Sequence, residues 1–176
     1  MRAWSPQLTL VEAGFTLTRP KMRARRIVVI QVDPCSPPTV ALIEELDRHL
    51  SQLYPAESNY LMDLDALCAP DVRFFAAHVD GETLGCGAIK QFADYTEVKR
   101  VYVSPRARGL GVAKLVIKAL ETATRDAGLR IMRLETGIYQ PDALALFEKV
   151  GFMRISSFGD YPKDDPYSVF MERKLP

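Results

Sequence analysis

Hydrophobic and polar positions in the first part of the chain follow two different periods. Residues 27–32 (IVVIQV) form a continuous β-branched run, which is typical of a strand. From Thr39 to Tyr54 the leucines recur three or four positions apart, so this segment predicts an amphipathic helix whose leucine face is buried. Residues 55–70 are less regular and predict one or two short helical turns.

Three strands and a long helix are predicted in the middle of the chain. Residues 74–79 and 83–90 flank an Asp-Gly pair, which favours a hairpin. Residues 98–103 predict a further strand, and after a glycine turn a helix runs to Gly128, a natural stop. The apolar stripe of this helix comprises Ala113, Val116, Ile117, Leu120 and Ala123.

The last third of the chain continues the mixture of strands and helices. Residues 131–135 predict a strand, and Pro141 opens a helix that ends before Gly151. A final strand pair is expected over 152–158 and 167–175.

The element order is therefore β–α–(α)–β–β–β–α–β–α–β–β, which predicts an α/β fold: a mixed sheet with helices on its faces. We expect one domain over residues 26–176. Residues 1–25 show no sustained period, and we expect an extension that is poorly ordered.

Composition and charge exclude some classes of partner. The chain has 176 residues and a net charge of +1, so no global attraction to nucleic acid or to a membrane is expected. The basic stretch at 19–26 (RPKMRARR) is interpreted as solvated chain, in preference to a nucleic-acid arm or a targeting peptide. No apolar run reaches the ~20 residues of a membrane span, and the start lacks the layout of a secretory signal.

The cysteines bear on the cellular compartment, and the cysteines and histidines together bear on metal binding. Cys35, Cys68 and Cys86 are widely separated and form no C-x-x-C, which predicts reduced thiols and a cytoplasmic location. The two histidines do not pair with a cysteine or a carboxylate at metal-ligand spacing. No metal site is predicted.

The segment from Val101 to Ala113 (VYVSPRARGLGVA) carries the chemistry. A strand leads through a Gly-x-Gly turn into a helix, which directs free N–H groups and the positive end of the helix dipole at one point. Such a turn suits a polyphosphate, and Arg106 and Arg108 add positive charge. The dinucleotide fingerprint fails because Lys114 stands where a small residue is required, and the P-loop pattern is absent. A purely structural turn is the alternative.

The wider pattern resembles the GNAT acetyltransferase superfamily. Arg106-x-x-Gly109-x-Gly111 follows V-Y-V-x-P, as in that family's R/Q-x-x-G-x-G/A signature. Downstream, L-E-T-G, the helix ALALFEKV and the final Gly-Phe pair resemble the family's next strand–helix unit. The likeness runs from about Ile27 to the C-terminus and is strongest over 97–152.

This resemblance implies that acetyl-CoA is the co-substrate and that no metal is needed. Its pyrophosphate would lie on the glycine turn, and its pantetheine arm would pair with the strand ending at Val103. The sheet would be splayed between that strand and 131–135, with the thioester in the gap. The residues predicted to bind the cofactor are Val101, Tyr102, Val103, Arg106, Arg108, Gly109, Leu110, Gly111, Val112, Ala113, Gln140 and Phe147.

Acetyl transfer to an amine needs a proton acceptor and can use a proton donor. Glu97 is the candidate base, since proteins of this type often carry a glutamate there; a solvated glutamate at a strand start is the alternative. By alternation it shares a face with Lys99 and Val101. The family's usual donor, a tyrosine, is replaced by Phe147. Either the thiolate leaves without an acid, or another tyrosine, Tyr161 or Tyr139, donates the proton; Tyr161 is the predicted catalytic residue.

The loop FGDYPKDDPYS between the last strands holds three aspartates, Asp160, Asp164 and Asp165. These carboxylates are interpreted as a solvated turn in preference to a site for a cationic amine.

The sequence thus predicts an acetyl-CoA-dependent N-acetyltransferase. It would move the acetyl group directly to a primary amine of a small molecule, an amino acid or a peptide. The alternative is a CoA-binding sensor or interaction module without turnover, which the change at Phe147 favours. No nucleic-acid or membrane partner is expected. Homodimers are common among proteins that resemble this one.

Overall fold

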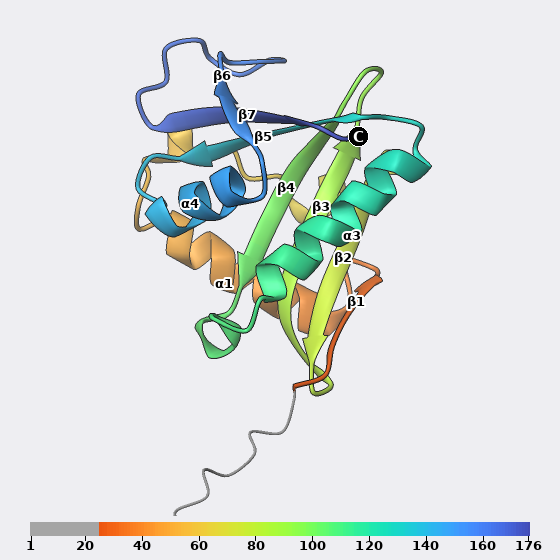
Figure 1. Cartoon of the computed structure of the whole chain (residues 1–176). Coiled ribbons are helices and arrows are strands. Elements are labelled where there is room, and N and C mark those ends of the chain that lie inside the picture. Colours follow the sequence, from red (N-terminus) through yellow and green to blue (C-terminus); the bar gives the residue numbers. More distant parts are fainter. Residues whose placement is uncertain (1–24) are drawn as a thin grey trace, which may run out of the picture.

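The computed structural model describes residues 25–176, which form a seven-stranded mixed sheet (Figure 1). The strand order is β1-β2-β3-β4-β5-β7-β6, and every neighbouring pair is antiparallel except β4 and β5, which are parallel. The strands are β1 (Ile27–Gln31), β2 (Val72–Val79), β3 (Glu82–Gln91), β4 (Thr96–Val103), β5 (Ile131–Gly137), β6 (Met153–Ile155) and β7 (Ser168–Lys174).

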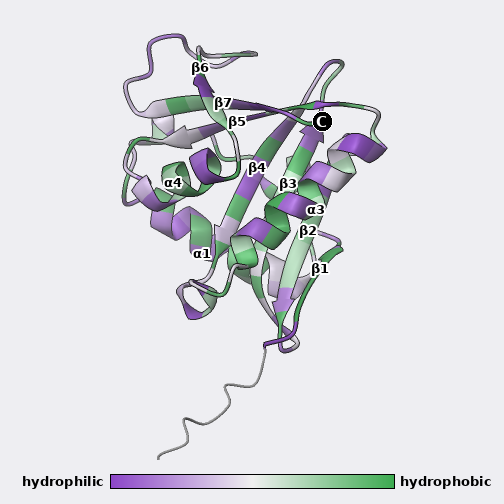
Figure 2. Ribbon diagram, viewed as in Figure 1, coloured by the Kyte–Doolittle hydropathy of each residue, from purple (hydrophilic) through white to green (hydrophobic). Residues whose placement is uncertain are grey.

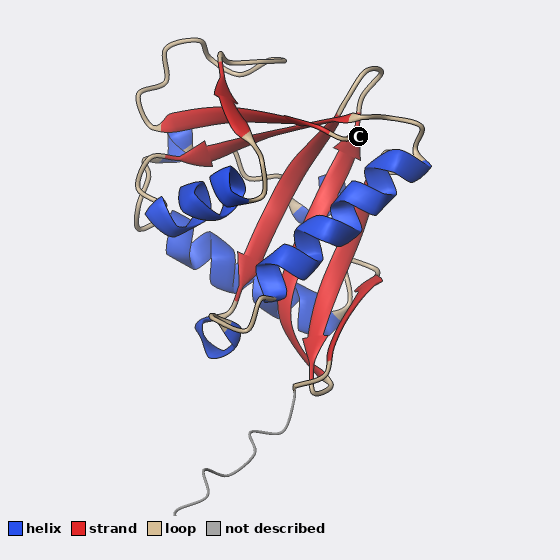
Figure 3. Cartoon of the chain, viewed as in Figure 1, coloured by secondary structure: helices blue, strands red, loops and turns tan. Residues whose placement is uncertain are grey.

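Helices cover both faces of this sheet (Figure 3). α3 and α4 pack on one face over a core that includes Val116, Leu120 and Phe147. α1 and α2 pack on the other face over a smaller core that includes Leu46 and Tyr102. The helices are α1 (Pro37–Leu50), α2 (Leu64–Leu67), α3 (Val112–Asp126) and α4 (Pro141–Lys149), with short 3₁₀ turns η1 (Ala56–Ser58) and η2 (Pro105–Ala107).

The predicted fold class and element order are confirmed, and several boundaries differ, most clearly those of α1 and β6. α1 begins two residues earlier, because prolines are tolerated in a first helical turn. It ends at Leu50, and a separate turn carries the chain to Tyr54, since the residue before Pro55 avoids the helical conformation. The expected strand over 152–158 is limited to β6. The extension predicted for 1–25 lies outside the described residues, apart from Arg25.

Over residues 25–176, no helix combines the length and the apolar character that a bilayer crossing requires. The longest, α3, is amphipathic, with hydrophobic and hydrophilic segments along one helix (Figure 2).

α3 lies unusually close to β3. A Cβ atom at Gly85 would be 2.8 Å from Val112, and one at Gly87 would be 2.7 Å from Val116. Cβ atoms do not approach other side chains so closely. The two glycines therefore allow α3 to pack directly against the backbone of β3. This contact fixes the height of the glycine turn above the sheet.

β4 contains a bulge that reverses its alternation. Its pairing with β3 jumps from Ala88↔Lys99 to Cys86↔Tyr102, and Arg100 adopts a φ of +56°. Consequently Lys99 and Arg100 point to the same face, toward α1 and α2, where Arg100 forms an ion pair with Asp47. Val101 points to the α3 face instead. The expectation that Val101 shares a face with Glu97 is wrong for this reason.

β4 and β5 separate soon after they meet. They pair only from Thr96↔Met132 to Val98↔Leu134, and the second half of β4 has no pairing to β5. Figure 1 shows the two strands diverging toward the end of β4 that leads to α3. The splay predicted from the family resemblance is therefore present.

Candidate active site

Three adjoining cavities follow the gap between β4 and β5. A groove of about 350 Å³ lies between the end of β4 and the start of α4, and is lined by residues that include Val101, Val103 and Arg108. A central cavity of about 100 Å³ lies between Lys99 and Glu135. An aromatic cavity of about 390 Å³ lies beyond it, under the β6–β7 loop.

These cavities share lining residues and so are neighbours along the gap. The groove and the central cavity have Val101, Gln140 and Phe147 in common. The central and aromatic cavities share Lys99 and the segment Tyr60–Met62. The central cavity therefore lies between the groove and the aromatic cavity.

The glycine turn at one end of the groove suits an anion. Gly109 and Gly111 have φ values of +77° and +81°, which other residues rarely adopt. A Cβ at either position would meet no atom within 4 Å, so backbone conformation and not space requires glycine here. Gly111 precedes α3 without a capping side chain, and the first turn of α3 has no acidic residue. Its N–H groups and dipole therefore face outward uncompensated.

The two arginines of the turn are placed differently. Arg108 lines the groove, where its Nε donates to the carbonyl of Val103 at 3.4 Å. Arg106 extends to Glu82 at the start of β3, and its Nη2 donates to Oε2 at 2.7 Å. The Glu82 carboxylate raises the pKa of Arg106. Arg108 is thus the arginine whose side chain reaches the groove.

The remaining residues predicted to bind cofactor fall into two groups. Val101, Tyr102, Val103, Ala113, Gln140 and Phe147 line the groove. Leu110 is exposed on the turn, whereas Val112 is buried beneath it against Gly85. Phe147 is buried and packs edge-on against Phe152, with centroids 5.6 Å apart, so its ring is a wall that carries no hydroxyl.

Glu97 and Tyr161 meet directly. The Tyr161 hydroxyl donates to Glu97 Oε1 at 2.5 Å, although the two residues are 64 positions apart. Lys99 Nζ lies 3.0 Å from the same carboxylate oxygen and also donates to the Tyr161 hydroxyl. The side chain of Glu97 is only 6% exposed. The interpretation of Glu97 as a solvated residue is therefore wrong, because the strand carries it beneath the β6–β7 loop.

Tyr161 remains a neutral phenol under ordinary conditions. Burial and the neighbouring negative charge of Glu97 both raise its pKa well above the usual value. Its ring packs against Phe158, Phe170 and Tyr60. It can therefore hold or pass on a proton, but it does not become a phenolate near neutral pH.

Five of the twelve residues that line the aromatic cavity carry aromatic rings. Phe92 and Tyr95 stack with centroids 4.7 Å apart, and Tyr95 meets Phe158 edge-on. Glu97 and Lys99 form part of its floor, and the full set of aromatic walls is Tyr60, Phe92, Tyr95, Phe158 and Tyr161. A planar apolar group would find complementary surfaces here, next to a carboxylate.

The aspartates of the β6–β7 loop have separate surroundings. Asp165 accepts hydrogen bonds from the Tyr60 hydroxyl at 2.6 Å and from the N–H of Tyr167 at 2.9 Å. The bond to Asp165 raises the pKa of Tyr60 to about 12. Asp160 lines the aromatic cavity, whereas Asp164 lines none of the three cavities. Asp165 thus fastens the β6–β7 loop to the segment after α1.

Two residues of the central cavity were missed in the sequence. Glu135 lies on β5 and accepts a hydrogen bond from Ser168 at 2.7 Å; burial raises its pKa. The only sequence signal was a charged residue inside an apolar strand. Tyr54 packs so closely on Gly137 that a Cβ there would lie 2.1 Å from its ring, and its hydroxyl accepts the N–H of Tyr139 at 2.9 Å. No local pattern distinguishes this tyrosine.

A splayed mixed sheet with a glycine turn at the mouth of the gap defines the class of CoA-dependent acyltransferases. Residues 22–152 match the Acetyltransferase (GNAT) family, and the chain belongs to it. It is an acyltransferase of the N-acetyltransferase type.

Two relatives support this assignment, and the similarity extends over nearly the whole length of each. The chain is 45% identical over 151 residues to an IAA acetyltransferase from Azospirillum brasilense, covering 85% of this chain and 98% of the relative. It is 34% identical over 140 residues to the uncharacterized N-acetyltransferase YsnE of Bacillus subtilis, covering 77% and 91% of the two chains.

Solved structures agree with the fold. A structure described as an acyl-CoA N-acyltransferase from Klebsiella pneumoniae has a TM-score of 0.72 and 32% identity, with coverage of 85% of this chain and 97% of that one. The PaiA N-acetyltransferase of Thermoplasma acidophilum, solved with coenzyme A, has a TM-score of 0.67 at 17% identity, covering 85% and 99%.

Proposed function

We propose that this protein transfers the acetyl group of acetyl-CoA directly to a primary amine of a small molecule, amino acid or peptide. The observation that carries the proposal is the row of neighbouring cavities from the groove beside the glycine turn, along the gap beside β4, to the aromatic cavity with Glu97 in its lining. One substrate would enter from each end, and the two would meet at the central cavity.

The groove offers a separate contact for each part of the cofactor. The N–H groups of the turn and the first turn of α3, with Arg108, would bind the pyrophosphate. The unpaired edge of β4 over 99–103 would pair with the pantetheine arm like an added strand. Gln140, at the start of α4, faces both the groove and the central cavity and can offer its amide.

Proton transfer would use the cluster around Glu97. An alkylammonium must lose a proton before it attacks, which costs about 4–5 kcal/mol near neutral pH. Glu97 would accept that proton at Oε1. Tyr161 would pass a proton to the departing thiolate as it takes one from protonated Glu97, so that no phenolate forms and the net change moves one proton from the amine to CoA. Lys99 would hold the carboxylate in position.

The lining of the aromatic cavity favours an amine that carries a planar apolar group. Its rings can bury such a group, and its volume of about 390 Å³ suits a small molecule. The name of the Azospirillum relative makes IAA a further compound to include among the acceptors tested.

The decisive experiment measures CoA thiol release and product mass with acetyl-CoA and a panel of acceptors. The panel should contain arylalkyl amines, aliphatic amines, amino acids, a peptide and IAA. Acetylated product from an amine, with release of CoA, is the expected result. Tight acetyl-CoA binding without acetylated product from any acceptor would support the sensor alternative.

The cofactor site is tested with the variant Gly109→Val/Gly111→Val. We expect acetyl-CoA affinity to fall at least tenfold in calorimetry, because valine is strained at both positive φ values. Gly128→Val is the matched control, since Gly128 has a φ of +76° at the far end of α3 and open space around it. An equal loss of affinity in the control, or none in the double variant, would contradict the assignment.

A further inference from the structure

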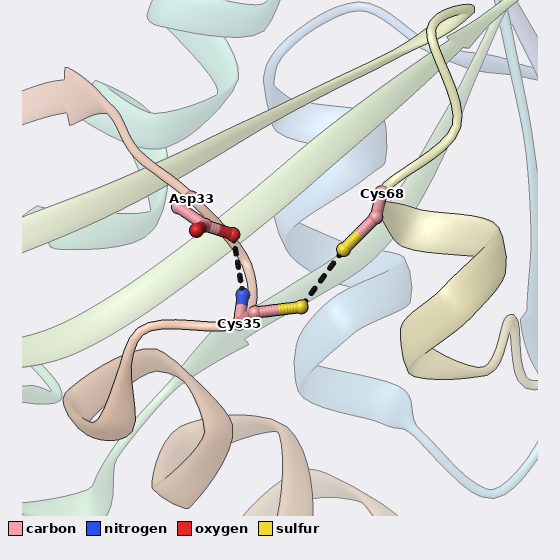
Figure 4. Close-up of side chains that lie close together, drawn as sticks. All are labelled: Asp33, Cys35 and Cys68. Carbon is pink, nitrogen blue, oxygen red and sulfur yellow. Dashed lines mark hydrogen bonds between the residues drawn. The ribbon is translucent and has the colours of Figure 1, made fainter.

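The fold brings Cys68 next to Asp33 and Cys35, two neighbouring residues of a distant loop, and this cluster of metal-ligating side chains lies away from the cavities. Asp33 and Cys35 lie in the loop between β1 and α1, and Cys68 follows α2 (Figure 4). The two sulfur atoms are 2.9 Å apart although the cysteines are 33 positions apart. The carboxylate and both sulfurs lie within 4.8 Å of one another, and all three residues are exposed.

We propose that Asp33, Cys35 and Cys68 bind one Zn²⁺ ion, with water as the fourth ligand. Two thiolates and a carboxylate suit this borderline-soft cation and do not suit Mg²⁺ or Ca²⁺, which prefer all-oxygen sites. Binding would displace one proton from each thiol. This site is independent of the acetyl-transfer function and of the three cavities.

The local geometry can accommodate the ion with small movements. Tetrahedral Zn²⁺ with Zn–S bonds of about 2.3 Å places its sulfurs ~3.8 Å apart, so the present contact must open by ~0.9 Å. Both cysteines are exposed, which leaves room for this rotation. Asp33 Oδ1 accepts the N–H of Cys35 at 2.8 Å, which orients the carboxylate beside the two cysteines (Figure 4).

The site would join two segments that frame the acceptor side of the molecule. Cys35 lies just before α1, and Cys68 lies just after α2. Between α1 and α2 runs Tyr60–Met62, which lines the central and aromatic cavities. A bound ion would fasten both ends of this α1–α2 unit to each other. The sequence predicted no metal site because its three ligands are contributed by two separate loops.

The experiment uses the full chain, reduced and metal-free, titrated with Co²⁺ under anaerobic conditions. Tetrahedral thiolate-bound Co²⁺ gives strong visible bands and a near-ultraviolet sulfur-to-metal band that oxygen-bound Co²⁺ lacks. We expect one equivalent to produce both and Zn²⁺ to remove them. Cys35→Ser and Cys68→Ser should abolish the tetrahedral spectrum, and Asp33→Asn should weaken binding at least tenfold.

Two controls make the result specific. Asp94→Asn removes an exposed carboxylate elsewhere and should leave Co²⁺ affinity unchanged. Zn²⁺ should protect Cys35 and Cys68 from alkylation, identified by peptide mass, with Cys86 unaffected because it is buried. Circular dichroism of each variant verifies the fold.

Several outcomes would overturn the site. These are the absence of a tetrahedral spectrum, its persistence in both serine variants, or equal affinity in Asp33→Asn and the unsubstituted chain. A loss of two mass units on treatment with oxidised glutathione, in protein that binds no Co²⁺, would show a disulfide-forming pair instead of a metal site.

Discussion

At the scale of single residues, the candidate site depends on one carboxylate held by two neighbours. Glu97 is buried on β4 and contacts Tyr161 and Lys99 through the same oxygen. A buried carboxylate requires such partners, because desolvation without them is costly. The same contacts would keep Glu97 oriented toward an amine in the aromatic cavity.

Replacement of this carboxylate tests its role. Glu97→Gln keeps the shape but cannot accept a proton, so we expect kcat to fall by about 10²–10³-fold while acetyl-CoA affinity changes less than threefold. Steady-state kinetics with calorimetry measure both. Glu148→Gln, an exposed glutamate on α4, is the control. Unchanged turnover in Glu97→Gln would remove Glu97 from the reaction.

A second residue-scale prediction concerns stability and pH. Burial raises the pKa of Glu135 above its usual value, so ionising it in the folded chain costs more than in the unfolded chain. That cost is absent below the pKa that Glu135 has in the unfolded chain. It grows as the pH rises through the higher pKa that Glu135 has in the folded chain. We therefore expect Glu135→Gln to melt at a higher temperature than the unsubstituted chain at pH 7, with the difference shrinking toward pH 4. A difference that grows on acidification would contradict the sign.

At the scale of elements, the position of α3 depends on the absence of side chains from β3. Val116 occupies the space where Gly87 would carry a Cβ, and Leu120 lies 3.3 Å from the same point. The helix therefore sits low on the sheet, and its N-terminus meets the end of β4. The placement of α3 and the position of the glycine turn are thus linked through two packed glycines.

A double-mutant cycle tests this contact. Gly87→Ala should lower the free energy of unfolding by about 1–3 kcal/mol through overpacking, and Val116→Ala by about 1–2 kcal/mol through a cavity. Because the second change removes the clashing methyl, the pair together should cost clearly less than the sum. Urea unfolding supplies all four values, and strict additivity would show that the two residues do not compete for space.

At the scale of the whole molecule, the acceptor side is assembled from segments distant in sequence. The β3–β4 turn supplies Phe92 and Tyr95, the segment after α1 supplies Tyr60, and the β6–β7 loop supplies Phe158 and Tyr161. The bond from Tyr60 to Asp165 joins two of these segments. If the aromatic cavity holds the acceptor, as proposed, selectivity is a property of the assembled fold.

The aromatic walls give a prediction about selectivity. Phe92→Ala should reduce kcat/KM for arylalkyl amines about tenfold or more, because a stacking surface is lost. A small aliphatic amine does not reach that wall, so its kcat/KM in the same variant should change less than threefold. Equal losses for both classes would indicate damage to the site as a whole.

The sequence by itself determined the element order, the fold class and the glycine turn. These follow from local periods and from residues such as Gly109 and Gly111, whose conformational freedom is an intrinsic property. The resemblance to the GNAT family also suggested Glu97 as the base and, because Phe147 replaces the family's usual tyrosine, Tyr161 as the donor.

Only the tertiary structure decided how these parts meet. The bulge at Arg100 turned Val101 away from Glu97, and the β6–β7 loop brought Tyr161 onto Glu97 across 64 positions. Only the fold shows that Glu135 is buried in the central cavity and that Asp33, Cys35 and Cys68 lie close together. The physical reason is that spacing along a chain encodes contacts within a helix or strand, whereas contacts between elements depend on register, splay and loop path.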